Sequence, residues 1–448
     1  MLKEDLKEKK NLLIITDLFP PAGGAGVQYV LKLIKYLRIF NWQPIILTVK
    51  TNDFWIIDRT LEKHIDFSAL RIYRVSSFKL PRFDQIEVND RNNDKNIYKK
   101  KRESLKRILD PVLRFLNSYL FIPDKRVSWI PFAYFKAKNI LRYEKIDVIF
   151  TISPAFSTSL VGTMLKKRFG KPLVSYFLDP WTDNPYNVSP LLNKFVNSKL
   201  ERWLMTYVDR AIFCTRRFAD YISFKYPLYK EKISYIPIGF DPEDFKDVDL
   251  QGKLDKHRLI ITYTGTFYGH RNPHVFLNAL ALLLEKKPEL RSKINVKFIG
   301  ASKIDLTETV EKLNLKDVIE IIDYVPWKTA ITFLRSSDVL LLIVGEYDDI
   351  FVPGKLYEYL GIKKFILGIG SEGEAKEIIE KSNSGVFFRN DQIEELSDFI
   401  YKLYFLKSKG EVKINPNIEY ISQFYSQNCI KRLTEIFNEI LNEQENKL

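Results

Sequence analysis

Short runs of branched aliphatic residues alternate with longer amphipathic stretches along most of the chain. Five of these runs are apolar at nearly every position: 11–16 (NLLIIT), 146–152 (IDVIFTI), 173–177 (LVSYF), 259–264 (LIITYT) and 338–345 (DVLLLIVG). Such runs are typical of strands buried on both faces of a parallel sheet. The stretches between them carry apolar residues at helical spacing, as at Val27, Val30 and Ile34. The pattern predicts an α/β fold of repeated β-α units.

The alternation stops once, in the polar and acidic stretch 241–257, and then begins again. Because 448 residues exceed one typical hydrophobic core, we read this stretch as a linker between two domains. The predicted N-terminal domain is 1–245 and the predicted C-terminal domain is 256–420. Right-handed crossovers make each a Rossmann-like parallel-sheet domain, and a ligand is expected in a cleft between the two.

Composition narrows the class of partner. The chain has 70 Lys and Arg against 56 Asp and Glu, a net charge of +14 that favours acidic partners such as nucleotide phosphates or anionic lipid. Two cysteines without metal-ligand spacing exclude a disulfide framework and suit a reducing compartment. The charged N-terminus has no apolar signal region, and no apolar run reaches spanning length. We therefore expect a cytoplasmic protein, either soluble or peripheral on the inner face of the plasma membrane.

A basic helical insertion is predicted at about 83–125. Six cations precede apolar residues at helical intervals: Lys99, Lys100, Lys101, Arg102, Lys106 and Arg107, then Leu109, Val112, Leu113, Leu116 and Leu120. A basic flank beside an apolar stripe can dock on an anionic membrane surface. It equally fits a helix packed on the domain with a solvated basic side. The charge could also suit nucleic acid, but no nucleic-acid-binding module is present, so none is expected as a partner.

The segment FVPGKLYEYL (351–360) changes to helical periodicity directly after a predicted buried strand. Pro353 suits a first helical turn, so Lys355 and Glu358 share a face near the helix N-terminus. Helices that open at the carboxyl end of a strand bind anions in α/β sheets. A surface Lys–Glu pair on an ordinary helix is the alternative.

The segment GTFYGHRNP (265–273) has the same arrangement after an earlier strand. Gly265 and Thr266 open this loop, and Arg271 stands just ahead of a helix N-terminus, where a phosphate ligand would be placed. His270 and His274 are four residues apart, but no third ligand is near, so a metal site is not expected.

Two further segments of the first half are candidates. Gly23, Gly24 and Gly26 lie where the first helix begins and fit either a phosphate-binding turn or a structural turn; the dinucleotide fingerprint is not met. Asp179 opens the polar and aromatic stretch DPWTDNPY beyond a strand's carboxyl end, where substrate contacts are common, although Asp-Pro and Asn-Pro are also turn signals.

The ordered motifs FPPAGGAGVQ, DPWTDNPY, YIPIGFDPEDF, GTFYGHRNP and PGKLYEYL resemble those of retaining GT-B glycosyltransferases. The chain is most similar to the family-4-like group of bacterial surface polysaccharide synthesis. The resemblance implies a nucleotide-sugar donor of the UDP or GDP type, held mainly by the C-terminal domain. It implies a glycan or lipid-linked acceptor held by the N-terminal domain, no divalent metal or other cofactor, and terminal helices at 421–448 that return to the first domain.

Within this resemblance, Glu358 matches the second acid of the Glu-x7-Glu motif, which contacts the donor ribose. The first acid would fall at Ile350, so the motif is incomplete. Lys355 and Arg271 are then the diphosphate ligands, with Gly265, Thr266 and Leu356 beside them in the donor site.

The resemblance also assigns Gly23, Gly24 and Gly26 to a loop that closes over the donor. Relatives often have arginines where this chain has Tyr29 and Leu178, which puts acceptor choice and activity in question.

The predicted reaction is sugar transfer with retention. Cations and helix N-termini stabilise the leaving nucleoside diphosphate. No paired carboxylates indicate a double-displacement nucleophile, so front-face attack is favoured, with Asp179 orienting the acceptor. A nucleotide-sugar epimerase on the same architecture and a non-catalytic scaffold remain as alternatives.

Overall fold

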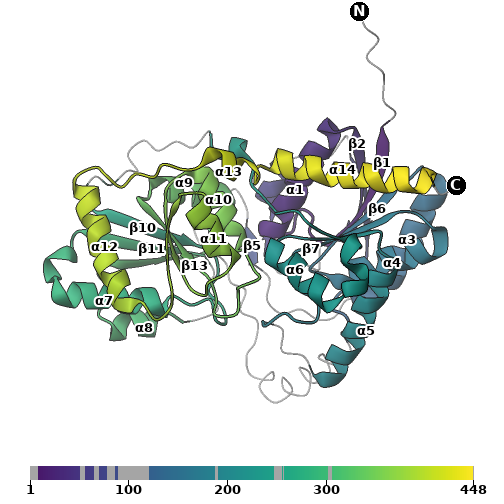
Figure 1. The fold of residues 1–448 in the computed structure, drawn as a ribbon. Coiled ribbons are helices and arrows are strands. Elements are labelled where there is room, and N and C mark those ends of the chain that lie inside the picture. Colours follow the sequence, from purple (N-terminus) through teal and green to yellow (C-terminus); the bar gives the residue numbers. More distant parts are fainter. Residues whose placement is uncertain are drawn as a thin grey trace, which may run out of the picture. The chain divides into compact units, whose positions relative to one another are not determined.

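The computed structural model describes residues 9–50, 56–64, 70–77, 86–88, 121–186, 190–246, 255, 257–300 and 305–446. The chain divides into two compact units, residues 1–237 with 426–448, and residues 238–425 (Figure 1). Most of the predicted basic insertion, including the cations at 99–107, lies outside the described residues. None of the helices in the described ranges is long and apolar enough to cross a membrane.

The first unit is built on a seven-stranded sheet of order β4-β2-β1-β6-β7-β8-β9 with all neighbours parallel. Its strands are β1 Lys10–Ile15, β2 Trp42–Val49, β4 Arg71–Val75, β6 Val148–Ile152, β7 Leu173–Phe177, β8 Arg210–Phe213 and β9 Ile233–Tyr235. Strands β3 Ile56–Asp58 and β5 Ile86–Val88 form a separate parallel pair. Residues Leu12 to Ile15 are fully buried, as expected for a central strand that is covered on both faces.

The helices of this unit run between these strands, except α14, which follows the second unit at the end of the chain. They are α1 Ala25–Ile39, α3 Ile130–Tyr143, α4 Phe156–Phe169, α5 Leu191–Tyr207, α6 Arg216–Lys225 and α14 Ser426–Glu445, with 3₁₀ turns η2 Arg59–His64, η4 Val127–Trp129 and η5 Pro227–Lys232 (Figure 1). Parallel strands need such connections because no tight turn can join them.

Helix α14, the last of the chain, packs within the first unit. The Phe437 ring lies edge-on to Trp42 at 5.2 Å and to Phe150 at 5.3 Å between ring centroids. Lys10 Nζ donates to Asn438 Oδ1 at 2.7 Å. A buried aromatic cluster therefore joins the end of the chain to the first sheet.

The second unit has a six-stranded parallel sheet of order β12-β11-β10-β13-β14-β15. Its strands are β10 Leu259–Thr264, β11 Ile294–Ile299, β12 Ile319–Ile322, β13 Val339–Ile343, β14 Phe365–Ile369 and β15 Gly385–Phe388. Its helices are α7 His274–Lys286, α8 Thr307–Lys312, α9 Trp327–Ser336, α10 Gly354–Ile362, α11 Glu374–Lys381, α12 Ile393–Ser408 and α13 Ile418–Ser422, with 3₁₀ turns η6 Pro242–Phe245 and η7 Pro288–Leu290.

Two hydrophobic cores cover the faces of this sheet. Helices α7 and α12 pack with Leu341 on one face, and helices α9, α10 and α11 pack with Leu340 and Leu342 on the other. Successive strand residues point to opposite faces, so β13 contributes to both cores. The predicted fold class of two parallel-sheet α/β domains is confirmed.

The division between the units falls after Pro237, earlier than the predicted end of the first domain at 245. The reason is packing around Phe240 and Phe245, which belong to the core of the second unit. A Cβ added to Gly361 of α10 would lie 2.8 Å from Phe240 Cδ2, so these aromatic residues need the glycine. Apolar anchoring of this short segment was not visible in its polar sequence pattern.

Candidate active site

The ends of β10 and β11 approach each other closely at two glycines. Gly265 has φ +121° and Gly300 has φ +135°, both in the region that side chains rarely adopt. A Cβ added to Gly300 would lie 2.7 Å from the Gly265 carbonyl oxygen, and one added to Gly265 would lie 2.7 Å from Lys355 Nζ. Glycine at 265 therefore leaves the space into which the lysine extends.

Lys355 is the second residue of α10 and its ammonium lies on an aromatic face. Nζ is 3.6 Å from the ring centroid of Tyr263 on β10. The contact that the described structure gives this Nζ is with an aromatic ring and not with a carboxylate. Burial and the nearby Arg271 hold the pKa of Lys355 well below its usual range, and Glu358 opposes this shift only in part. An unpaired cation in such a place suits an anionic ligand.

Arg271 is fixed by a buried acid. Its Nε donates to Asp348 Oδ2 at 2.5 Å and its Nη1 donates to the Tyr268 hydroxyl at 2.7 Å. Asp348 is fully buried, and its Oδ2 also accepts from the Gly345 backbone N–H at 2.8 Å. The loop after β13 thus holds the guanidinium in one orientation near Lys355.

Glu358 lies one turn beyond Lys355 on α10 and is bound by an indole. Trp327, the first residue of α9, donates from Nε1 to Glu358 Oε1 at 2.9 Å. This bond orients the carboxylate without neutralising it. The first acid of the motif is absent, because position 350 is isoleucine. The contact described here for Glu358 is with a neutral donor, the Trp327 indole.

The two other predicted donor-site residues of this unit are Leu356 and Thr266. Leu356 is fully buried in the core beneath α10, so its side chain packs and is not exposed to a ligand. The Thr266 carbonyl accepts a long hydrogen bond of 3.4 Å from the Tyr263 hydroxyl.

A pocket of about 260 Å³ opens at the carboxyl ends of β13 and β14, next to Arg271 in sequence. It is lined by His270, Asn272, Val275, Phe276, Ile343, Val344, Glu346, Ile369 and Asn390. His270 Nδ1 lies 3.8 Å from Glu346 Oε2. Within the described parts of the chain, no three His, Cys, Asp or Glu residues are grouped to hold a metal ion.

The glycines of the first unit differ from one another. Gly24 caps α1 with φ 109°, and a Cβ built on it would meet no protein atom within 4 Å, so a ligand can approach there. A Cβ on Gly26 would lie 2.8 Å from Leu18 Cδ1, which makes that glycine a packing requirement. Gly23 precedes both and is partly buried.

Tyr29 and Leu178 are the two positions where the resemblance led us to expect arginine. Tyr29 is buried and stacks on Tyr176 with ring centroids 4.9 Å apart, and burial raises the pKa of its hydroxyl. The Leu178 carbonyl accepts from Cys214 Sγ at 3.2 Å. The aromatic ring at position 29 thus completes the core of the first unit.

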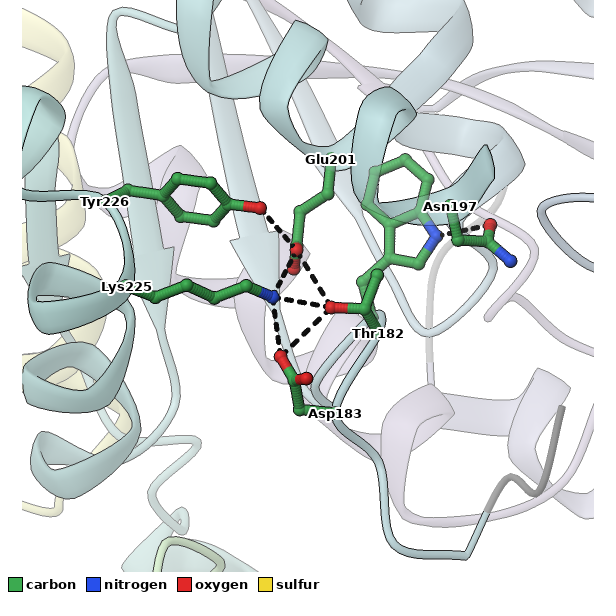
Figure 2. Close-up of polar contacts among 7 residues, drawn as sticks. Thr182, Asp183, Asn197, Glu201, Lys225 and Tyr226 are labelled. Atoms are coloured by element: carbon green, nitrogen blue, oxygen red, sulfur yellow. Dashed lines mark hydrogen bonds and ion pairs between the residues drawn. The ribbon is translucent and has the colours of Figure 1, made fainter. Parts of the chain in front are cut away.

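Asp179 is partly buried and begins the loop after β7, which is anchored by the polar network of Figure 2. Lys225 Nζ donates to Asp183 Oδ2 at 2.5 Å and to Glu201 Oε2 at 2.6 Å. Burial acts to lower the pKa of Lys225, but the two carboxylates outweigh burial and raise it. Thr182 also accepts from Lys225, at 2.5 Å. Lys225 therefore ties the loop after β7 to helices α5 and α6.

Sequence reasoning placed Arg271, Lys355 and Gly265 at strand ends of one sheet, and the structure brings them together. Sequence reasoning missed Tyr263, Asp348 and Trp327, which contact these residues or Glu358 and position them. A single signal was available for Asp348, an acid in the short loop between a buried strand and the PGK segment. The aromatic partners had no sequence signal, because Tyr263 and Trp327 look like ordinary apolar positions.

Comparison with known families supports the fold and identifies the chain as a glycosyltransferase. Residues 97–244 match the sequence model of Glycosyltransferase Family 4, and residues 244–415 match that of Glycosyl transferases group 1. The chain therefore contains a glycosyltransferase group 1 domain, which includes Arg271, Lys355 and Glu358.

Two curated relatives are D-inositol 3-phosphate glycosyltransferases, from Streptomyces avermitilis and Streptomyces scabiei. Each is 25% identical over 155 residues, which is 32% of this chain. The match spans about a third of the relatives' own length, 33% and 35%.

Solved structures share the fold over nearly the whole chain. Sucrose-phosphate synthase from Thermosynechococcus elongatus has a TM-score of 0.66 and 13% identity, covering 97% of this chain and 100% of that one. Anabaena Alr3699/HepE in complex with UDP-glucose has a TM-score of 0.60 and 12% identity, covering 96% and 99%. At these identities the likeness shows the fold, which is the GT-B type of two parallel-sheet domains.

Proposed function

We propose that this chain transfers a sugar from a nucleotide-sugar donor to a glycan or lipid-linked acceptor, with retention, in the synthesis of a cell-surface polysaccharide. The observation that carries the proposal is the Lys355 ammonium, stacked on Tyr263 without a carboxylate partner in the described structure and next to Arg271. Two cations beside a helix N-terminus are the arrangement that a diphosphate requires. The matched families and the UDP-glucose complex of a fold neighbour support a nucleotide-sugar as the ligand.

Each side chain has a role in this proposal. Lys355 and Arg271 bind the diphosphate and stabilise the negative charge that develops as it leaves. Asp348 holds Arg271 so that its remaining N–H groups face the ligand. Glu358, oriented by Trp327, accepts hydrogen bonds from the ribose hydroxyls.

Front-face attack is favoured because the two carboxylates that contact Arg271 and Trp327 are engaged. Asp348 is fully buried against Arg271, and Glu358 is bound by Trp327. A double displacement needs a carboxylate that can reach the sugar carbon from the opposite face. The departing phosphate then serves as the base for the acceptor hydroxyl. We assign the orientation of the acceptor to Asp179 and approach of the donor to the open backbone at Gly24.

A panel of UDP- and GDP-sugars tests the proposal. At saturating concentration, about 100 times Kd, the cognate donor should stabilise the second unit by about 2.7 kcal/mol and raise its Tm by about 5–11 °C. The same shift is expected in EDTA, because no divalent metal takes part. The absence of a shift with every nucleotide-sugar would refute donor binding. Product analysis without acceptor then distinguishes transfer from epimerisation, since only an epimerase converts the donor alone.

A further inference from the structure

In its N-terminal part, helix α5 of the first unit buries polar residues and exposes apolar ones. The face turned to the protein carries Asn193, Asn197 and Glu201, which are 5%, 8% and 5% exposed. Helices on the surface of a protein normally bury apolar residues at this spacing and expose polar ones. The other buried residues of α5, Leu204 and Met205 at its C-terminal end, are apolar, so it is the N-terminal part of the buried side that a hydrophobic core does not hold.

A polar network holds that side instead (Figure 2). Trp181 donates from Nε1 to Asn197 Oδ1 at 2.9 Å. Glu201 Oε2 accepts from Lys225 Nζ at 2.6 Å and from the Tyr226 hydroxyl at 2.7 Å. Buried charged groups are tolerated when they are paired and hydrogen-bonded in this way. The network fixes the rotation of α5 about its own axis and so decides which residues face outward.

The outward residues at the start of α5 are large and apolar. Leu191, Leu192 and Phe195 are 85%, 57% and 61% exposed. Because they lie within one turn, they form a continuous apolar surface rather than scattered single residues. Exposed apolar surface of this kind marks an interaction site.

The charges of the same helix select the partner. Lys194, Lys199 and Arg202 are exposed, while the single carboxylate of α5, Glu201, is buried against Lys225. Lys199 Nζ lies 5.3 Å from the ring centroid of Phe195, so a cation and an apolar group are presented together. Lysines beside leucine and phenylalanine are the composition of helices that lie in the headgroup region of anionic membranes.

We infer that the N-terminal half of α5 docks on an anionic lipid surface, with its apolar side chains in the acyl boundary and its lysines at the phosphates. A second copy of the chain fits less well, because a two-fold contact through α5 would set one row of lysines against another. The inference does not depend on the proposed reaction, since it uses neither the donor site nor Asp179. It also uses none of the cations at 99–107.

Flotation with vesicles of phosphatidylethanolamine and phosphatidylglycerol, without donor, tests the surface. The full chain should bind these vesicles and not pure phosphatidylcholine. The variant L191S/L192S/F195S should lose about 100-fold in partition coefficient, because three large apolar groups no longer insert. The matched variant I321S/F405S/I418S removes exposed apolar residues from the second unit and should bind like the parent.

The charge contribution is tested separately with K194Q/K199Q. The partition coefficient of this variant should be about 10-fold lower than that of the parent, and the difference should disappear in high salt. K286Q/K402Q, which changes two exposed lysines of the second unit, is its control. All variants should keep the parent Tm, since the altered side chains are outside the core.

Equal vesicle binding by L191S/L192S/F195S and the parent would overturn the inference, as would a parent that ignores anionic vesicles. The surface would belong to a second copy instead if the parent did not bind vesicles and light scattering showed a parent dimer that L191S/L192S/F195S does not form. The donor-induced shift in Tm is measured in parallel. If the parent showed no donor-induced shift but still bound anionic vesicles, the proposed reaction would be refuted and the inference about the lipid surface would not be affected.

Discussion

Replacement of Lys355 by methionine separates ligand binding from folding at the centre of the proposed donor site. Methionine keeps an unbranched stem that can pack on Tyr263 but removes the ammonium, which lies 3.6 Å from that ring. A hydrogen bond from a charged donor contributes about 1.5–3 kcal/mol. The affinity for the cognate nucleotide-sugar should therefore fall about 10- to 150-fold.

The same change should not weaken the fold. Burial and Arg271 lower the pKa of Lys355, which means that the folded protein disfavours its charged form. Lys355→Met removes this charge from a place where no carboxylate of the described structure pairs with it. The Tm without ligand should be equal to the parent's or higher, while the donor-induced shift should be lost.

The pH dependence adds an independent readout. Donor affinity of the parent should fall as pH rises through the lowered pKa of Lys355, because only the ammonium binds the diphosphate. Between this pKa and the usual value of about 10.4, the unfolded chain binds more protons than the folded one. In that window the stability of the unliganded parent should rise with pH, and Lys355→Met should lack both trends.

Isothermal titration with the nucleotide-sugar and thermal unfolding across pH measure these effects. Lys286→Met, which changes an exposed lysine of α7, is the matched control and should behave like the parent. If Lys355→Met bound the donor as tightly as the parent, the diphosphate would not lie at this lysine. A large loss of Tm would instead show that Lys355 is a structural cation.

Three further changes test the surroundings. Gly265→Ala should destabilise by about 1–2 kcal/mol, because of the positive φ, and should weaken donor binding by displacing Lys355; thermal unfolding and titration report the two effects. Trp327→Phe removes the N–H donor to Glu358 and should weaken nucleoside diphosphate binding about 5-fold, with a Tm within a few degrees of the parent. Phe437→Ala should destabilise the first unit by about 3–5 kcal/mol while the donor-induced shift of the second unit persists.

Each of these expectations has a clear counter-result. Unchanged donor affinity in Gly265→Ala would mean that the lysine need not occupy the glycine's space. Trp327→Phe with parental nucleotide binding would remove Glu358 from the ribose site. A parental Tm for Phe437→Ala would show that α14 does not contribute to the first core.

Much of the fold follows from local pattern. Apolar runs such as 338–345 are typical of buried strands, and the helical periods between them fit crossovers, so two parallel sheets were predictable. The glycines and prolines of GTFYGHRNP and PGKLYEYL mark backbone conformations, which is why Gly265, Arg271 and Lys355 were found at strand ends. The exact end of the first unit was missed, because the aromatic anchors at Phe240 and Phe245 act across a polar segment.

What the sequence determined by itself was the class of fold and the cations of the proposed donor site, since both depend on neighbours within a few residues. Only the tertiary structure decided how those cations are held. Arg271 and Asp348 are 77 residues apart, and Trp327 and Glu358 are 31 apart, so no local spacing joins them. The outward apolar face of α5 was likewise hidden, because periodicity gives a helix two faces but not which one is buried. Here the hydrogen bonds of Glu201 turned the polar face inward.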